Sequence, residues 1–266
     1  MELEVLGIGN AFTATHYNTS FLIRGSENIL IDGPQGLLRC LRERNVTAEE
    51  IAGVIVTHIH GDHTAGLETL LLYKRYCQGC RTPLFTSRKV YEQLSTRFFP
   101  GFADTFDTEM RRIVGTEFEE YVDFRELDEE GATQITEGLS VEIRHNWHPT
   151  PTLGLKLKTR DRTVGISGDT CFRPRLLRQL REDGTISEQQ YDRLAGNWLW
   201  DSDLIYHEVD RVPGGPHTHE DDLLALGTDT CSRMRLTHVP DGFEERDIPI
   251  ASEGERVKLV GPLEIH

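Results

Sequence analysis

The sequence has little of three things that mark common protein classes: cysteine, long apolar runs and positive charge. Its five cysteines in 266 residues are too few and too scattered for a disulfide framework. The longest apolar stretches, such as Val54-Ile55-Val56, have the length of a strand, which excludes a transmembrane helix. The first residues, Met1-Glu2-Leu3-Glu4, carry acid where a secretory signal carries base, so we expect a cytoplasmic protein.

The deficit of positive charge bears on the partners. The chain has 29 Lys and Arg against 44 Asp and Glu, a formal net charge of −15. A surface of that sign repels a polyanion, so long nucleic acid is a poor partner and a small-molecule substrate is expected. Bound cations would offset part of the negative charge, although a surface charge that keeps the protein in solution explains it equally well.

The hydrophobic pattern alternates between strand-like and helix-like segments. Predicted strands cover residues 3–8, 19–23, 28–31, 54–57, 83–86, 139–144, 153–157, 163–166, 203–207, 234–237 and 257–265. Predicted helices cover residues 37–44, a capped turn at 47–50, and residues 64–76, 87–96, 175–181, 187–195 and 219–226. This pattern favours a single α/β domain over residues 1–266, with a sheet-rich core covered by helices.

One part of the chain is harder to interpret, and we expect an insertion at about residues 73–130. Its later part, residues 98–130, is acidic and rich in aromatic residues, namely Phe98, Phe99, Phe102, Phe106, Phe118, Tyr121 and Phe124. These side chains either form a lid that faces the substrate or pack as a small cluster beneath loops. Cys77 and Cys80 have redox or zinc spacing, but no second pair completes a four-cysteine site, so we favour an incidental role.

The strongest functional signal is the run Thr57-His58-Ile59-His60-Gly61-Asp62-His63. It follows an apolar strand and precedes a helix, which places it on a loop at the C-terminal edge of a strand. Residues two apart in an extended segment face the same way, so His58 and His60 can converge on one cation, while Gly61 lets Asp62 and His63 turn toward a second position. Three imidazoles and a carboxylate suit zinc or a similar divalent ion.

This run resembles the His-x-His-x-Asp-His signature of the metallo-β-lactamase superfamily. The resemblance implies a four-layer αββα sandwich that holds two metal ions at one edge. Later residues follow in the family's order: Ser167-Gly168-Asp169-Thr170 resembles the motif of the bridging aspartate, and His238 resembles the last histidine ligand. Asp32, at the end of an early strand, is similar to the family's buried structural aspartate.

One further histidine ligand is implied, and two residues compete for the position. His148 lies six residues before Gly154 (154 − 148 = 6), the spacing found in the ribonuclease Z branch, whereas His145 lies nine before it. We favour His148. The resemblance then assigns His58, His60 and His148 to one ion, Asp62, His63 and His238 to the other, and Asp169 to both.

A second set of residues resembles the ribonuclease Z and phosphodiesterase branch of the superfamily. In that branch a His-Glu pair on a strand is followed by a histidine at the start of a helix, as in His207-Glu208 and His217 here. The separation of His217 from His238 is 21 residues (238 − 217 = 21), close to that of the branch. The resemblance implies that His217 is a catalytic histidine and Glu208 its orienting partner, with His219 as the alternative.

The resemblance implies metal-assisted hydrolysis of a phosphodiester. Two divalent ions, zinc before manganese or iron, would lower the pKa of a water between them so that hydroxide exists near neutral pH. Asp62 would help orient this nucleophile, and His217 would donate a hydrogen bond to the oxyanion or a proton to the leaving group. Ribonuclease Z proteins carry a long tRNA-gripping arm between the middle histidine and the bridging aspartate, whereas only 21 residues (169 − 148 = 21) separate them here.

The missing arm and the negative charge disfavour tRNA 3′ processing, and a small phosphodiester or nucleotide is the better substrate. Hydrolysis of a lactone or thioester at the same site stays open as an alternative. A non-hydrolytic di-iron redox or sensor protein is a second one, because the same ligands accept iron. Edge insertions in this family often meet across a two-fold axis, so a homodimer is our working expectation.

Overall fold

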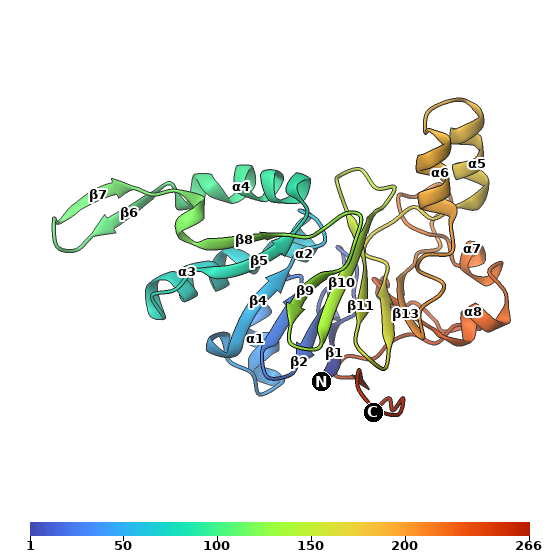
Figure 1. Ribbon diagram of the computed structural model, residues 1–266, viewed down its shortest axis with the longest axis horizontal. Helices are drawn as coiled ribbons and strands as arrows, with labels where there is room; N and C mark the ends of the chain where they lie inside the picture. Colours follow the sequence, from blue (N-terminus) through green and yellow to red (C-terminus); the bar gives the residue numbers. More distant parts are fainter.

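Two β-sheets pack face to face in the structure, a computed structural model that describes residues 1–266 apart from the Phe99 side chain. Helices cover the outer face of each sheet, which gives the four layers that the sequence predicts (Figure 1). The first sheet has the order β15-β1-β2-β3-β4-β5-β8 and the second the order β14-β13-β12-β11-β10-β9. The fold is therefore the α/β, αββα sandwich of the metallo-β-lactamase superfamily.

The strands of the first sheet are β1 (Glu2–Gly7), β2 (Ser20–Arg24), β3 (Asn28–Ile31), β4 (Ile51–Ile55), β5 (Thr82–Thr86), β8 (Val122–Glu126) and β15 (Arg256–Lys258). Those of the second are β9 (Thr133–Thr136), β10 (Leu139–His145), β11 (Leu153–Lys158), β12 (Thr163–Ile166), β13 (Leu204–Glu208) and β14 (Met234–Thr237). A separate hairpin joins β6 (Asp104–Asp107) to β7 (Arg112–Gly115).

The helices are α1 (Leu37–Glu43), α2 (Gly61–Thr64), α3 (Leu67–Cys77), α4 (Arg88–Phe102), α5 (Pro174–Glu182), α6 (Glu188–Ala195), α7 (Glu220–Leu224) and α8 (Thr228–Ser232). Two short 3-10 turns, η1 (Ala48–Glu50) and η2 (Phe118–Glu120), complete the elements. Among the helices described, none has both the length and the apolar character needed to cross a bilayer.

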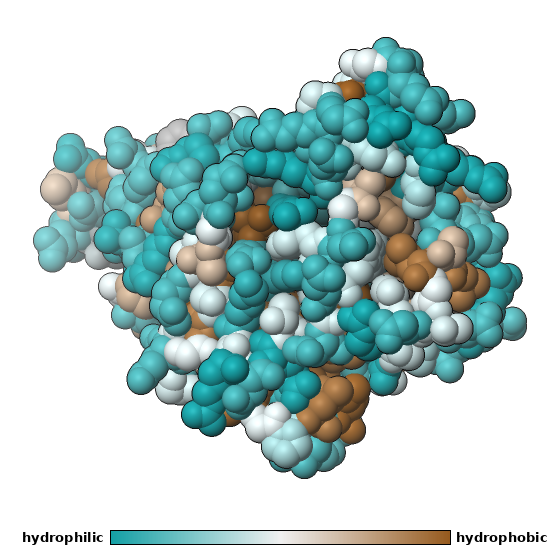
Figure 2. All heavy atoms as spheres, turned by 45° about the vertical axis from the view of Figure 1, so that its right-hand side comes forward, coloured by the Kyte–Doolittle hydropathy of each residue, from teal (hydrophilic) through white to brown (hydrophobic). Residues whose placement is uncertain are grey.

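The core lies between the two sheets. Strands β1 to β5 and β11 to β14 are buried almost throughout, because each sheet is covered on one face by the other sheet and on the other by helices. Phe21 of β2 and Tyr206 of β13 meet edge to face across this layer, with ring centroids 5.2 Å apart. Hydrophilic side chains cover most of the outer surface seen in Figure 2, where the apolar patches are small and separate.

The parallel pairing of strands explains why the loops that carry the potential metal ligands lie at one end of the sandwich. β3, β4, β5 and β8 pair in parallel in the first sheet, and β12, β13 and β14 do so in the second. The carboxyl ends of parallel strands lie at the same edge of a sheet, so the loops that leave β3, β4, β12, β13 and β14 gather at one end of the sandwich.

Several elements differ from the sequence-based expectation. The helix expected at 64–76 begins only at Leu67, as α3, and Thr64 instead ends the one-turn helix α2; between them the Gly66 N–H donates to the Gly33 carbonyl oxygen at 2.9 Å rather than within a helix. Asp62 and His63 thus lie on the one-turn helix α2 rather than on a loop. Helix α4 runs past residue 96 to Phe102, and the last strand is confined to β15.

Residues 73–130, the expected insertion, contribute two strands to the seven-stranded sheet and also form a projecting hairpin. β5 and β8 belong to the seven-stranded sheet, whereas the β6–β7 hairpin extends away from the body at the left of Figure 1. Phe102, Phe118 and Tyr121 are buried and stack on one another, as expected for a cluster packed beneath loops. Phe106, on the hairpin, is 61% exposed. Phe99 lies outside the described side chains.

Candidate metal centre

Asp32 fixes the start of the histidine-rich segment. Its carboxylate accepts hydrogen bonds from the Thr57 backbone N–H (2.8 Å) and the Thr57 hydroxyl (2.7 Å), and its Oδ2 lies 2.8 Å from His63 Nδ1. This last contact sets the orientation of the His63 ring. Its other nitrogen, Nε2, is buried and has no hydrogen-bond partner among the described residues. A buried nitrogen of this kind is free to bind a metal ion.

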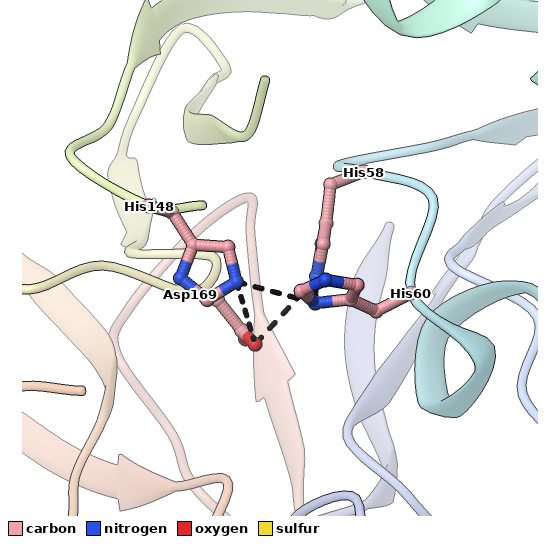
Figure 3. A group of neighbouring side chains, drawn as sticks. All are labelled: His58, His60, His148 and Asp169. Atoms are coloured by element: carbon pink, nitrogen blue, oxygen red, sulfur yellow. Dashed lines mark hydrogen bonds and ion pairs between the residues drawn. The ribbon is translucent and has the colours of Figure 1, made fainter. Parts of the chain in front are cut away.

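The first group of potential ligands is His58, His60, His148 and Asp169, and their ligand atoms lie within 4.8 Å of one another. Figure 3 shows the side chains pointing toward a common centre from three loops, those after β4, β10 and β12. His60 Nδ1 lies 3.1 Å from His58 Nε2 and 3.2 Å from His148 Nε2. Asp169 Oδ2 lies 3.6 Å from His58 Nε2.

A second group, Asp62, His63, Asp169 and His238, is formed in the same way. Asp169 Oδ1 lies 3.2 Å from His63 Nε2, while its Oδ2 lies 3.5 Å from His238 Nε2. His238 Nε2 is also 3.2 Å from Asp62 Oδ2. Since Asp169 belongs to both groups, its carboxylate lies between them.

The residues fit a pair of divalent ions. Besides Asp169, each group has three residues that offer one ligand atom each. In the first group, the nitrogens of His58, His60 and His148 face one another, and no carboxyl or carbonyl oxygen of the described residues lies within hydrogen-bonding distance of them. Two imidazole nitrogens at this separation repel each other if both carry lone pairs. They attract only when a cation or a shared proton lies between them. The donor set of histidine and aspartate suits zinc, manganese or iron.

Burial favours the neutral, metal-binding form of two histidines of the first group, whereas at His63 burial is outweighed by Asp169 and Asp32, which raise the pKa. In the first group, burial disfavours the charged imidazolium and so holds the pKa of His58 well below its usual range, and it lowers the pKa of His148 to about 4. Burial opposes ionisation of Asp169, but the neighbouring histidines, His238 first among them, outweigh it, so the pKa of Asp169 lies well below its usual range. Neutral imidazoles and an ionised carboxylate are the forms that bind metal.

The loops that carry Asp169 and His238 are held by residues that the sequence did not single out. Asn146 Nδ2 donates to the carbonyl oxygens of Ser167 (2.7 Å) and Asp169 (3.0 Å), which ties the loop after β10 to the loop after β12. The His238 backbone N–H donates to Thr19 Oγ1 at 2.9 Å. A single asparagine or threonine near a strand end has no pattern that would have revealed these contacts.

Glu208 and His217 lie beside the second group. His217 Nδ1 is 3.0 Å from Glu208 Oε2, an ion pair without the linear geometry of a hydrogen bond. The His217 ring lies 4.6 Å from that of His238, centroid to centroid. Burial opposes protonation of His217, but Glu208 and the carboxylates of Asp169 and Asp210 outweigh it and raise the pKa of His217 to about 9.

His145 and His219, the alternatives to His148 and His217, lie outside the groups of potential ligands. His145 Nε2 is 3.0 Å from Glu129 Oε1, and His145 belongs to neither group of ligands. His219 is the N-cap of α7, where its ring accepts from the Asp221 N–H. Cys77 and Cys80 are exposed at the end of α3.

The fold and these residues define a hydrolase of the metallo-β-lactamase superfamily. Residues 1–260 match the family described as "Anti-Pycsar protein Apyc1", and the chain belongs to that family. A protein named Anti-Pycsar protein Apyc1 from Saccharibacillus brassicae is 29% identical over 247 residues, which cover 92% of each chain.

One more distant relative and two solved structures are also similar to this chain. A protein from Dictyostelium discoideum named cAMP/cGMP-dependent 3′,5′-cAMP/cGMP phosphodiesterase B is 23% identical over 91% of this chain and 21% of its own length. The metallo-β-lactamase fold protein YhfI from Bacillus subtilis superimposes with a TM-score of 0.68 at 16% identity, covering 96% of this chain and 98% of its own. The short form of human tRNase Z has a TM-score of 0.65 at 19% identity, covering 98% and 100%.

The comparisons confirm two sequence-based predictions, the metallo-β-lactamase superfamily and a hydrolase of the phosphodiesterase kind, and ribonuclease Z is found only as a distant structural neighbour.

Proposed function

We propose that this chain is a phosphodiesterase that opens 3′,5′-cyclic nucleotides with the help of two divalent metal ions. The observation that carries the proposal is the pair of ligand groups that share Asp169, with His217 and Glu208 beside them. The activity in the name of the Dictyostelium discoideum relative supports the same substrate class. The negative net charge and the short segment from His148 to Asp169 argue against tRNA.

His58, His60, His148 and Asp169 would hold one ion, and Asp62, His63, Asp169 and His238 the other. Zinc is the ion we propose, with manganese and iron as alternatives for this donor set. When bound, such a pair supplies a nucleophile at neutral pH and neutralises charge on the phosphoryl oxygens. Asp62, already ionised by its histidine neighbours, would help to orient the attacking water.

His217 has the position and charge for work on the leaving group. Its proton is held near neutral pH because Glu208 faces its Nδ1, so its Nε2 can donate to the departing ribose oxygen or to the oxyanion. Glu208 is a positioning residue, since its Oε1 also accepts from the Thr218 N–H at 2.8 Å and thereby fixes the carboxylate.

Three broader expectations go with this proposal. The chain would act as a single domain over residues 1–266 with an insertion at about 73–130, it would form a homodimer, and it would be located in the cytoplasm. Each is independent of the site chemistry.

The test is hydrolysis of the 3′,5′-cyclic phosphates of adenosine, guanosine, cytidine and uridine, with the 5′-monophosphates measured by chromatography. A thioester and a lactone are assayed in parallel. Asp169→Ala should lower the rate by about 10³-fold or more and reduce the metal-to-protein ratio, because it removes a ligand of both ions. Asp192→Ala, an exposed aspartate on α6, is the matched control.

Hydrolysis of the thioester or lactone with all four cyclic nucleotides left intact would overturn the proposal. So would full activity and full metal content in Asp169→Ala.

A further inference from the structure

An open groove of about 530 Å³ lies between helix α4 and two loops of the metal centre. Its α4 side is formed by Lys89, Gln93, Thr96 and Arg97, together with Glu92. Ile59 and Pro151 form the opposite side. The volume falls within the range of small-molecule sites.

The groove adjoins the potential metal ligands. Ile59 stands between His58 and His60 in the chain, and Pro151 follows His148 by three residues (151 − 148 = 3). Consecutive Cα atoms are about 3.8 Å apart, so the groove begins one residue from His58 and His60 and three residues from His148. The Arg97 guanidinium donates to the Ile59 carbonyl oxygen and holds α4 against the metal loop. A ligand whose phosphate lies at the metal centre can therefore extend into this groove.

The chemistry of the two walls differs. Ile59 and Pro151 offer apolar surface, which suits the flat face of a nucleobase. On the other wall, the Gln93 side chain is half-buried, and its Oε1 is buried without a hydrogen-bond partner among the described residues. The hydroxyl of Thr150, next to Pro151, is also buried without a hydrogen-bond partner among the described residues. Unsatisfied buried acceptors are rare because they cost free energy, and a base offers N–H groups along its edge to satisfy one.

Charge in the groove also favours a nucleotide. Lys89 and Arg97 bring two cations against the single carboxylate of Glu92, in a protein whose net charge is −15. Local positive charge of this kind attracts an anionic substrate that the rest of the surface repels.

We propose that this groove binds the nucleoside part of the cyclic nucleotide, with the base against Ile59 and Pro151 and its edge hydrogen-bonded to the Gln93 amide. Gln93 is thereby a specificity-determining residue for the reaction. The inference rests on the proposed function, because it assumes a nucleotide whose phosphate reaches the metal centre.

The test compares two substrates of the holoenzyme, a 3′,5′-cyclic nucleotide and bis(p-nitrophenyl) phosphate, a phosphodiester without a base. Gln93→Leu removes the amide and keeps the size of the side chain. The ratio of kcat/KM for the cyclic nucleotide to that for the base-free diester should fall about tenfold, chiefly through KM. Thr96→Trp, which fills the groove from the same helix, should lower the ratio in the same direction.

Gln189→Leu is the matched control, an exposed glutamine on α6 that should keep the wild-type ratio. An unchanged ratio in both Gln93→Leu and Thr96→Trp, with wild-type protein active on both substrates, overturns the groove proposal and leaves the proposed function intact. Wild-type protein that cleaves neither substrate refutes the proposed function, and the groove proposal with it. Turnover of the base-free diester by Gln93→Leu shows that the variant is folded.

Discussion

Glu208 makes two contacts at the level of single atoms. Its Oε1 accepts from the Thr218 backbone, and its Oε2 faces His217 Nδ1. The Glu208 backbone N–H in turn donates to Ser167 Oγ at 2.9 Å, close in the chain to Asp169. The His217 ring thus faces the carboxylate of a residue whose backbone is hydrogen-bonded to the loop that carries Asp169.

We expect His217→Ala to lower kcat by about 10²- to 10⁴-fold, the usual contribution of a general acid. The metal-to-protein ratio should not change, because neither proposed ion needs His217. Glu208→Gln should lower kcat by about tenfold, because the amide orients the ring without holding its charge. The measurements are steady-state kinetics on a cyclic nucleotide and elemental analysis.

The control for this pair is His145→Ala, since His145 pairs with Glu129 away from both groups. Full kcat in His217→Ala would contradict the assignment, and equal loss in His145→Ala would show that the effect is structural.

At the residue scale, sequence reasoning identified the groups that come together. The spacing in the run from His58 to His63 is local, so the chain itself constrains those side chains to one loop and one turn of helix. His148 was separated from His145 by spacing alone, and the structure places only His148 with the ligands. Asn146 and Thr19 act through contacts between segments far apart in the chain, and no local pattern predicts such contacts.

At the scale of elements, the turn between β12 and Asp169 requires glycine. Gly168 has φ of +57°, and a Cβ added there would lie 2.2 Å from the Leu153 carbonyl oxygen. The turn is therefore closed against β11, and it directs Asp169 toward both groups of ligands.

Gly168→Ala should lower the free energy of unfolding by about 3 kcal/mol, from the left-handed backbone and the forced shift of β11 together. Gly184→Ala is the matched control, because Gly184 has φ of +78° but nothing within 4 Å of its added Cβ. It should cost about 1 kcal/mol, the backbone contribution alone. Denaturant titration measures both, and equal losses in the two variants would contradict the close packing.

The loop after β14 clamps the loop after β1. Asp241 accepts hydrogen bonds from the Thr13 hydroxyl (2.5 Å), the Ala14 N–H (2.8 Å) and the Thr15 hydroxyl (2.7 Å). These bonds, led by that of Thr13, hold the pKa of Asp241 well below its usual range. A carboxyl whose pKa is lower in the folded than in the unfolded chain stabilises the fold above its ordinary pKa and loses that contribution as the pH falls.

We therefore expect the denaturation midpoint of the wild type to fall more between pH 6 and pH 3 than that of Asp241→Asn. The amide cannot gain a proton over this range, so its share of the stability does not titrate. Urea unfolding at the two pH values measures the difference, and the same fall in both proteins would show that the clamp contributes nothing.

Element boundaries were predictable where one local rule dominates. The capping box at Thr47 to Glu50 is formed as its spacing predicts, and the helix expected at 187–195 is found as α6. The division of α2 from α3 was not predictable, because the Gly66 N–H donates to the Gly33 carbonyl oxygen, which is a tertiary contact. The place of β8 at the sheet edge also depends on pairing with β5, far from its own sequence neighbours.

For the molecule as a whole, the metal ions should stabilise the fold. An ion that binds only the folded chain at about 1,000 times its Kd contributes about 4 kcal/mol. At roughly 2–4 °C per kcal/mol for a chain of this size, chelation should lower Tm by roughly 10 °C, and added zinc should restore it. Differential scanning calorimetry measures this. Asp169→Ala provides the control, since its Tm should barely respond to chelator, and a wild-type Tm indifferent to chelator would contradict the two sites.

The overall architecture was predictable because strand and helix periods alternate in an order that only a layered α/β fold accommodates, and because the metal motif fixes the superfamily. The direction in which the β6–β7 hairpin projects was not, since Phe106 and Ile113 alternate like buried strand residues and are nevertheless exposed.

The division of the ligands between the sheets has a consequence for biosynthesis. His58, His60, Asp62 and His63 follow a strand of the first sheet, whereas His148, Asp169 and His238 come from the second. In the proposed site, a nascent chain that ends before Asp169 would lack a ligand of both ions, and one that ends before His238 would lack a ligand of the second. Binding of both ions would then wait until most of the chain has been translated.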